Sequence, residues 1–381
     1  AEIVESEAAS RTPMGFGPYT TIEWVAGDHI TVHRNYYYFR EGLPKVDQIV
    51  YRFIGEDPNT AVAALLAGEC DILTQDTHMD EIIDLLLEQE AQGNLVPAIV
   101  TGTVWEHADF GITPVPEYDR PDFFGDVRTR QAIAMCLDRQ AIVDELLYGR
   151  SEVLHTYLPP NHPLFNPDVR QYPYDPAAAM ALLEEVGWTD EDGDGIREAN
   201  GVAGVPDGTP LSFKWGSTTA TVRVNMMQVF QVNLAECGIE VILENLPASE
   251  WFADGPDGPL FGRRFDIGQF AWLTGVEPPC NLYLTSETPS EANGWAGQNN
   301  PGYSNPEYDR VCNAAMQSLP GTPEYDQYHL EAQRIFAEEL PVIPLHLKLK
   351  IAASRPEVVG FSLDPTCNTE IFNIENFDLT E

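Results

Sequence analysis

Helix boundaries are the feature of this sequence that most limits its fold, because the same start and stop residues recur along the chain. Asp57-Pro58 and Asp175-Pro176 each place a capping carboxylate before a proline suited to the first helical position, and Gly68 and Gly187 end the runs that follow. The same pattern predicts helices that begin at Asn305-Pro306, Thr322-Pro323 and Val222, and one over 139–148 between Asp138 and Gly149. Short β-branched or aromatic runs such as QIVYRFI, LSFKWG and IEVIL predict strands between the helices, and this alternation is typical of an α/β fold.

Length and charge narrow the class of protein. The chain has 381 residues, which favours more than one domain, and contains no apolar run near the ~20 residues that span a bilayer. It carries 21 Lys and Arg against 60 Asp and Glu, so its net charge of -39 disfavours nucleic acid and anionic lipid as partners. The chain begins with Ala1 and shows no signal-peptide pattern, so we expect a processed or trimmed piece.

Six cysteines are spread along the chain without a CxxC motif, which disfavours a zinc ribbon or a thioredoxin-type site. Cys70, Cys136 and Cys237 have apolar neighbours, and we expect them to be small buried hydrophobic residues. Cys280 and Cys312 lie in polar stretches, and we predict that they form a disulfide in an oxidising compartment.

Seven motifs, in order, resemble those of the solute-binding proteins of peptide/nickel ABC importers. The resemblance covers residues from about Gly15 to about Leu349. Its motifs are GFGPY (15–19) with the Arg34-Asn35 pair, LLAGECDI (65–72), FGDVRTRQAI (124–133), YPYDP (172–176) with Gly187-Trp188, YSNPEYD (303–309), EAQRIF (331–336) and PVIPL (341–345).

The resemblance implies a two-lobed periplasmic-binding-protein fold of the Venus-flytrap type (type II), with the N-terminal subdomain absent from this sequence. It assigns residues 1–105 and 346–381 to the first lobe and 106–345 to the second. It further implies a monomer outside the cytoplasm that binds a solute between its lobes, docks on an ABC permease, and reaches the membrane only through an N-terminal anchor outside this sequence.

The expected activity is capture of an oligopeptide or a related small solute. A binder of sugars or other organic solutes within the same family, or a ligand sensor, stays open as an alternative. We do not expect an enzyme, because the chain has no GxSxG, HExxH or Cys/His signature.

The resemblance places solute contacts in the stretch 248–279. In peptide binders an Asp three residues after the tryptophan of this stretch holds the peptide ammonium group, and here Gly275 takes that position, with Glu277 nearby. Arg263 and Arg264 offer bidentate contacts to a carboxylate or phosphate, although surface ion pairing is the alternative. The candidate ligand-binding residues are Trp251, Arg263, Arg264, Gln269, Trp272 and Glu277, with Trp105 and Tyr157 as further aromatic residues for which core packing is the alternative.

One acidic segment has the spacing of a calcium-binding loop. Asp190, Asp192 and Asp194 fall at positions 1, 3 and 5 of such a loop, the carbonyl of Ile196 at position 7 and Glu198 at position 9. Gly201 stands at position 12, where the bidentate carboxylate belongs, so Asp207 would have to fold back. A structural calcium site and an acidic, solvated turn both stay open, and no other cofactor is expected.

Overall fold

The computed structural model describes residues 9, 11–55, 57–77, 79–367 and 369–380. The chain forms two compact units: unit 1 takes the residues up to 101 and from 349 onward, and unit 2 takes residues 102–348. The sequence-based lobe boundaries at 105 and 345 lie within a few residues of these divisions. The assignment of the units to lobes stays a prediction.

Unit 1 contains a three-stranded antiparallel sheet in the order β1 (Tyr19–Val25), β2 (His29–Arg34), β3 (Gln48–Arg52). Helix α2 (Pro58–Leu66) begins as predicted, because the Asp57 carboxylate accepts from the backbone N–H groups of Asn59 and Thr60. Helix α2 packs with α3 (Ile83–Ala91) in a core of buried apolar residues that includes Val62, Leu65, Met79, Ile83 and Leu86. The short elements of unit 1 are β4 (Ile72–Leu73), η1 (Gln75–Thr77), η2 (Met79–Ile82), β12 (Val358–Val359), η7 (Ile374–Asn376) and β13 (Asp378–Leu379).

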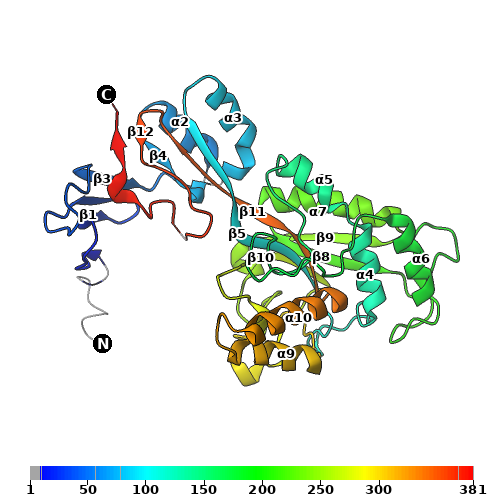
Figure 1. The fold of residues 1–381 in the computed structure, drawn as a ribbon. Helices are drawn as coiled ribbons and strands as arrows, with labels where there is room; N and C mark the ends of the chain where they lie inside the picture. Colours follow the sequence, from blue (N-terminus) through cyan, green and yellow to red (C-terminus); the bar gives the residue numbers. More distant parts are fainter. Residues whose placement is uncertain (1–8, 10, 56, 78, 368, 381) are drawn as a thin grey trace. The chain divides into compact units, whose positions relative to one another are not determined.

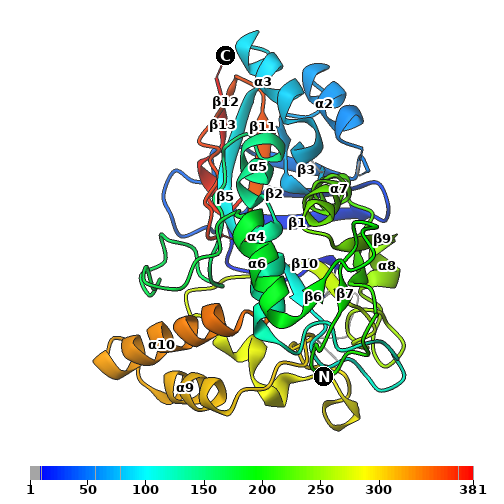
Figure 2. The same ribbon diagram turned by 90° about the vertical axis from the view of Figure 1, so that its right-hand side faces the viewer.

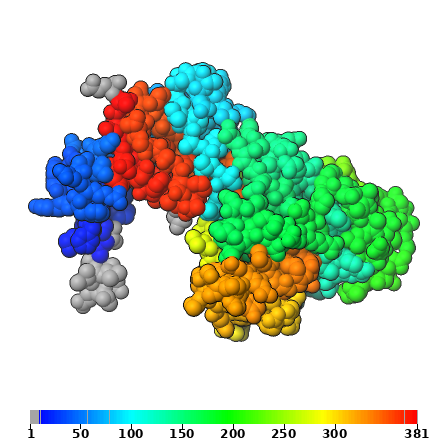
Figure 3. Space-filling view, viewed as in Figure 1, coloured from blue at the N-terminus to red at the C-terminus, as the bar shows by residue number. Residues whose placement is uncertain are grey.

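The C-terminal segment of the chain contacts earlier segments of unit 1. Figure 3 shows C-terminal residues, in red, beside N-terminal residues, in blue. The Glu375 carboxylate accepts from Arg40 Nη1 at 2.6 Å and its carbonyl accepts from the Lys45 N–H. Lys350, a buried residue, donates from Nζ to the carbonyls of Cys367 and Asp364.

A six-stranded sheet has the order β4-β11-β5-β10-β8-β9, and β5 (Val96–Phe110) and β11 (Val342–Ser354) each contain residues of both units. In unit 2, β10 (Ile267–Leu273) is antiparallel to β5 and parallel to β8 (Ser212–Thr218), which is parallel to β9 (Glu240–Leu246). Helix α7 (Thr221–Glu236) connects β8 to β9, as a crossover between parallel strands requires.

The other helices of unit 2 form two pairs. Helix α4 (Val127–Cys136) lies beside α6 (Pro176–Val186), and α9 (Pro306–Gln317) lies beside α10 (Pro323–Glu339), as Figures 1 and 2 both show. The largest core of the unit contains Phe124, Trp188, Trp215 and Phe230, all fully buried. The short elements are β6 (Trp188–Thr189), β7 (Glu198–Ala199), α8 (Ala248–Trp251), η4 (Cys280–Tyr283), η5 (Thr285–Glu287) and η6 (Glu291–Asn293).

The helix expected over 139–148 is only partly α-helical, which corrects the sequence-based prediction. Asp138 does cap it, accepting from the Ala141 N–H, but α5 (Arg139–Ala141) continues as a π-helical turn, η3 (Ile142–Leu146), in which the Leu147 N–H donates to the Ile142 carbonyl. The guanidinium group of Arg139 is buried and donates to the carbonyls of Leu154, Pro344 and Tyr172.

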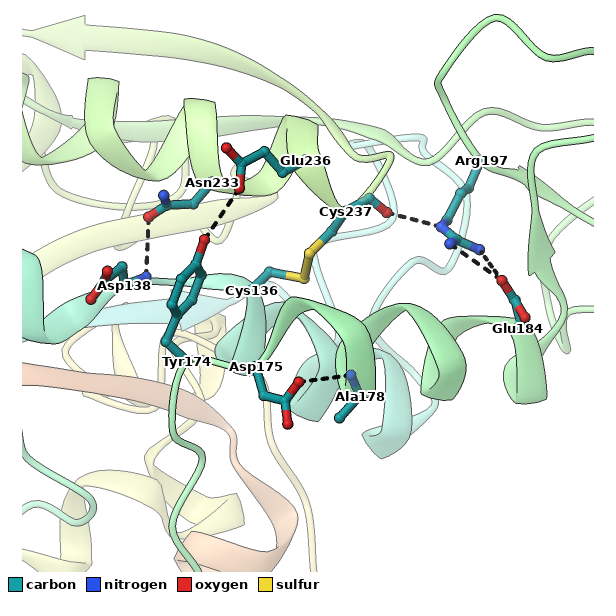
Figure 4. The surroundings of a disulfide bond; sticks show 10 residues. All are labelled: Cys136, Asp138, Tyr174, Asp175, Ala178, Glu184, Arg197, Asn233, Glu236 and Cys237. Atoms are coloured by element: carbon teal, nitrogen blue, oxygen red, sulfur yellow. Dashed lines mark hydrogen bonds and ion pairs between the residues drawn. A yellow bond between two sulfur atoms is a disulfide. The ribbon is translucent and has the colours of Figure 1, made fainter.

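Two disulfides lie in unit 2. The predicted Cys280–Cys312 bond is confirmed, and it joins η4 to α9. The expectation that Cys136 and Cys237 are simple buried hydrophobic residues is wrong, because they form a second disulfide that joins the ends of α4 and α7 (Figure 4). Cys70 is a free thiol and only half-buried, because it lies in the turn between α2 and β4. Within the described part of the chain, no helix combines the length and apolar character needed to cross a bilayer.

Candidate functional site

Strand β10 and the loop that follows it position three of the eight candidate ligand-binding residues: Gln269, Trp272 and Glu277. The strand pairs with β5 so that Gln269 lies opposite Ala108 and Trp272 lies opposite Trp105. The Trp272 ring contacts Phe270 with its centroid 5.2 Å away and is partly exposed. The chain then leaves the sheet at Leu273, and the loop 273–279 begins.

The backbone of loop 273–279 is fixed, and three of its side chains are exposed to solvent. Thr274 donates from its N–H to the Thr103 carbonyl at 2.8 Å and from Oγ1 to the Tyr157 carbonyl at 3.0 Å. Leu273, Val276 and Glu277 are exposed, with Val276 at 94% of its full accessible surface. The loop therefore offers two apolar side chains and one carboxylate on an anchored backbone.

Four of the candidate ligand-binding residues are fully buried: Trp105, Tyr157, Trp251 and Gln269. A Cβ atom added at Gly216 would lie 2.6 Å from the Trp251 ring, which shows how tightly this ring packs on β8. As they stand, these four side chains stabilise the interior of unit 2. Solute contact through any of the candidate residues stays a prediction.

Arg263 and Arg264 lie at the end of the glycine-rich loop before β10. Arg263 adopts a positive φ of 52° and donates from Nη1 to the Thr113 carbonyl at 2.6 Å, while Arg264 donates from Nε to the Pro256 carbonyl at 2.9 Å. Neither takes part in an ion pair among the described residues. Burial lowers the pKa of Arg263. Because neither guanidinium group has a carboxylate beside it among the described residues, both are suited to an anionic group of a solute.

The sequence did not reveal a buried ion pair that lies beside Gln269. Glu106, on β5, accepts from Nε and Nη2 of Arg223, on α7, at 2.6 and 3.0 Å, and its Oε1 lies 3.3 Å from Gln269 Nε2. Burial opposes the charge of Glu106, but Arg223 outweighs it and lowers the pKa of Glu106 to about 2. The only signal in the sequence is a charged segment, EHAD (106–109), inside an otherwise apolar strand.

The same segment holds a second buried polar pair. His107 and Asp109 are fully buried, and Nδ1 of the histidine lies 2.7 Å from Oδ1 of the aspartate. Burial raises the pKa of Asp109, although His107 opposes the rise. The two side chains belong to the interior of unit 2, where the His107 ring lies between those of Trp105 and Phe270.

The acidic segment 190–198 forms the turn between β6 and β7, and its three aspartates converge. Carboxylate oxygens of Asp190, Asp192 and Asp194 lie within 4.8 Å of one another on the exposed face of the turn. These carboxylates also accept from backbone N–H groups of the turn, with Asp190 bonding Gly193 at 2.7 Å and Asp194 bonding Ile196 at 2.8 Å.

The two other carboxylates of the calcium hypothesis, those of Asp207 and Glu198, make different contacts. Among the described residues the converging group consists of Asp190, Asp192 and Asp194 and leaves out Asp207, which accepts from the Gly201 N–H at 2.8 Å. Glu198 instead pairs with Thr189 in the small sheet and accepts from the Glu191 N–H. Three converging carboxylates suit a hard cation such as Ca²⁺, so Asp190, Asp192 and Asp194 are the residues that would hold it, with the carbonyl of Ile196 as a further expected ligand.

Arg197 fixes this turn to the body of unit 2. Its buried guanidinium group donates to the carbonyls of Cys237 and Trp188 at 2.9 Å each, and it lies 3.5 Å from the Glu184 carboxylate (Figure 4). The turn is thereby tied to the Cys136–Cys237 disulfide, so a cation bound there would have a structural role.

Comparisons with known proteins agree with this fold. The model of "Bacterial extracellular solute-binding proteins, family 5 Middle" matches residues 3–294. The chain is 28% identical, over 387 aligned residues, to the oligopeptide-binding protein AppA of Bacillus subtilis, and the alignment covers 100% of this chain and 65% of that protein. It is 26% identical to the glutathione-binding protein GsiB of Salmonella choleraesuis, with 96% of this chain and 64% of that protein covered.

Solved structures give the same result. An oligopeptide-binding protein of Thermus thermophilus, complexed with a pentapeptide, superposes with a TM-score of 0.75 at 28% identity, covering 95% of this chain and 62% of that one. NikZ of Campylobacter jejuni, in complex with Ni(L-His), shares the fold with a TM-score of 0.76 at 20% identity, over 98% of this chain and 70% of that one. The chain thus spans just under two thirds of the curated relatives described above. It belongs to family 5 of the bacterial extracellular solute-binding proteins.

Proposed function

We propose that this protein is the solute-binding component of an ABC importer, which captures an oligopeptide or a related small solute and delivers it to a membrane permease. The observation that carries the proposal is the family 5 match over residues 3–294, together with 28% identity to an oligopeptide-binding protein whose structure superposes with a TM-score of 0.75. Family members are binding proteins, and we propose no enzymatic activity for this chain.

The proposed solute contacts in unit 2 lie at both ends of β10: Arg263 and Arg264 precede the strand, and Trp272 and loop 273–279 lie at its other end. An exposed tip of Leu273 and Val276 suits apolar side chains of a peptide, and the two guanidinium groups without a carboxylate partner suit its carboxylates. Gly275 leaves open space, since a Cβ atom there would meet nothing nearer than the Glu277 nitrogen at 4.0 Å. Because Gly275 carries no carboxylate, we propose that Glu277 holds the ammonium group of an amine-bearing solute.

The proposed location is outside the cytoplasm. Two buried disulfides in one unit support it, because such bonds form and persist in oxidising compartments. The net charge of -39 supports a monomer that neither binds nucleic acid nor adheres to anionic lipid.

Thermal unfolding with a panel of solutes tests the proposal. A solute that binds only the folded protein raises the melting temperature, and a concentration of 100 times its Kd stabilises the fold by about 2.7 kcal/mol. The panel contains di- to nonapeptides, glutathione, sugars and nickel–histidine chelates. Peptides alone should raise the melting temperature, a rise with sugars alone would favour the alternative solute class, and no rise with the chain extended to the full length of its relatives would contradict the proposal. Mass spectrometry of solute released from that longer protein would identify the ligand.

A further inference from the structure

Two histidines meet where three segments of unit 2 join. His162 lies in the segment 159–166, which precedes α6, and His329 lies on α10. The third segment is loop 273–279, which carries the exposed Val276 and Glu277. The proposed capture of a solute uses the loop but neither histidine.

His162 contacts the loop through one ring nitrogen and its own segment through the other. Nε2 lies 3.2 Å from the Val276 carbonyl, and Nδ1 lies 3.1 Å from the backbone nitrogen of Leu164. A carbonyl needs a donor and an N–H needs an acceptor, so only the neutral ring with its proton on Nε2 makes both contacts. A second proton would occupy Nδ1 and face the Leu164 N–H.

His329 supports the same junction from α10. It is fully buried, no described residue hydrogen-bonds to either of its ring nitrogens, and its ring packs against Tyr325 with centroids 4.4 Å apart. The next turn of α10 fixes the segment of His162, because Gln333 Nε2 donates to the Leu164 carbonyl at 2.8 Å and to the His329 carbonyl at 3.0 Å. A proton on the buried His329 ring would therefore place a positive charge next to segment 159–166, whose His162 contacts loop 273–279.

The surroundings of His329 shift the pKa of its ring in both directions, and the lowering effects are the larger. Burial lowers the pKa of His329 to about 4, the charge of His162 lowers it further, and Asp326 on α10 opposes the shift. Glu277 in the loop faces Tyr325. Because the pKa of His329 is lowered from 6.5 to about 4 in this site, protons bind the state in which its ring is released first as the pH falls from about 6.5 towards 4.

We propose that His162 and His329 are acid-sensitive positioning residues. While both are neutral they hold Val276, in the outer part of loop 273–279, ordered for solute contact, and when they are protonated they release this part, whereas Thr274 keeps the base of the loop anchored. The consequence for solute affinity rests on the proposed function. The release of the loop does not, because it follows from the contacts within unit 2.

Methyl NMR of the chain, labelled at Leu and Val, tests the release. The Val276 signals are assigned by their loss in Val276→Ala and followed from pH 7.5 to 4.0. In the wild type they should move to the positions of a mobile chain between pH 6.5 and 4. In the double variant His162→Gln, His329→Phe, the amide keeps one donor and one acceptor and the phenyl ring keeps the packing, so the midpoint should fall by at least one pH unit or vanish. His33→Gln, on exposed β2, is the matched control and should leave the midpoint unchanged.

Two results would overturn the proposal: Val276 signals that do not move in the wild type down to pH 4.0, or the same midpoint in the double variant. If the double variant fails to fold, two other measurements test the proposal: the pH midpoint of His162→Gln alone, and the titration of the His329 ring in the wild type. A His329 ring that titrates near pH 6.5 in the folded protein contradicts the proposal. Binding of the tightest panel peptide should weaken at least tenfold from pH 7 to 4.5 in the wild type only. A chain that releases the loop but binds no solute at any pH would contradict the proposed function alone.

Discussion

Arg223 clamps both carboxylate oxygens of Glu106 inside unit 2, at 2.6 and 3.0 Å. The pair joins α7 to β5, and the two side chains are 10% and 2% exposed. Glu106→Gln removes the carboxylate charge from a buried ion pair, so we expect the free energy of unfolding to fall by about 3–5 kcal/mol in urea titrations. Glu307→Gln, which breaks the exposed pair with Arg310, is the control and should cost less than about 1 kcal/mol. Equal losses in the two variants would contradict this assignment.

The same pair makes stability depend on pH. Burial opposes the charge of Glu106, yet Arg223 lowers its pKa to about 2, against 4.5 for an unperturbed side chain. Because the unfolded chain binds this proton first, the contribution is complete above pH 4.5 and is lost as the pH falls towards 2. Melting temperatures measured from about pH 6 to about pH 2.5 should therefore fall less steeply in Glu106→Gln than in the wild type. Parallel curves would show that another carboxylate governs the acid limb.

The two disulfides should stabilise unit 2 to different extents. They close loops of 101 and 32 residues, for which the chain-entropy model gives about 4.7 and about 3.7 kcal/mol. Paired alanine substitutions at Cys136 and Cys237 should therefore destabilise more than those at Cys280 and Cys312, as measured by urea unfolding. Cys70→Ser and Cys367→Ser, at the two free thiols, should leave the midpoint nearly unchanged. A reversed order of the two bonds would count against the entropic account.

Local chemistry explains what the sequence predicted well. The caps at Asp57, Asp175, Asn305 and Thr322 each accept from backbone N–H groups of the helix that they begin, because a cap depends only on residues within one turn. The Cys280–Cys312 bond was also predictable, since both residues flank loops in polar surroundings. Family motifs supplied the fold class.

Features that depend on distant partners were not predictable in the same way. Cys136 pairs with a residue 101 positions away, and its apolar neighbours are no different from those of the free Cys70. Arg223 looks like an ordinary residue in the first turn of a helix until β5 places Glu106 beside it. Trp105 and Trp251 were candidate ligand-binding residues, but they lie on β5 and α8 with their rings in the core, and the sequence does not show which way a side chain points.

Calcium binding by the 190–198 turn has a direct test. If the three aspartates hold Ca²⁺, chelation should lower the melting temperature and excess calcium should restore it, since a ligand that binds only the folded state stabilises it. Asp192→Asn should remove the response, while Asp257→Asn, in another exposed loop, should not. A melting curve indifferent to both chelator and calcium would establish the alternative, an acidic turn held by its own backbone hydrogen bonds.

Trp272 is the sharpest test of where the solute binds. It lies near the end of β10, is partly exposed, and borders the loop with Val276 and Glu277. In the chain extended to the length of its relatives, Trp272→Ala should weaken solute binding at least tenfold, because buried tryptophans supply much of the binding energy of an interface. Trp272→Phe keeps most of the contact with Phe270 and should separate lost packing from lost recognition. Trp24→Ala, on β1 and also partly exposed, is the control in unit 1. If titration calorimetry finds the affinity of Trp272→Ala unchanged while the fold is intact, the solute does not bind at this end of β10.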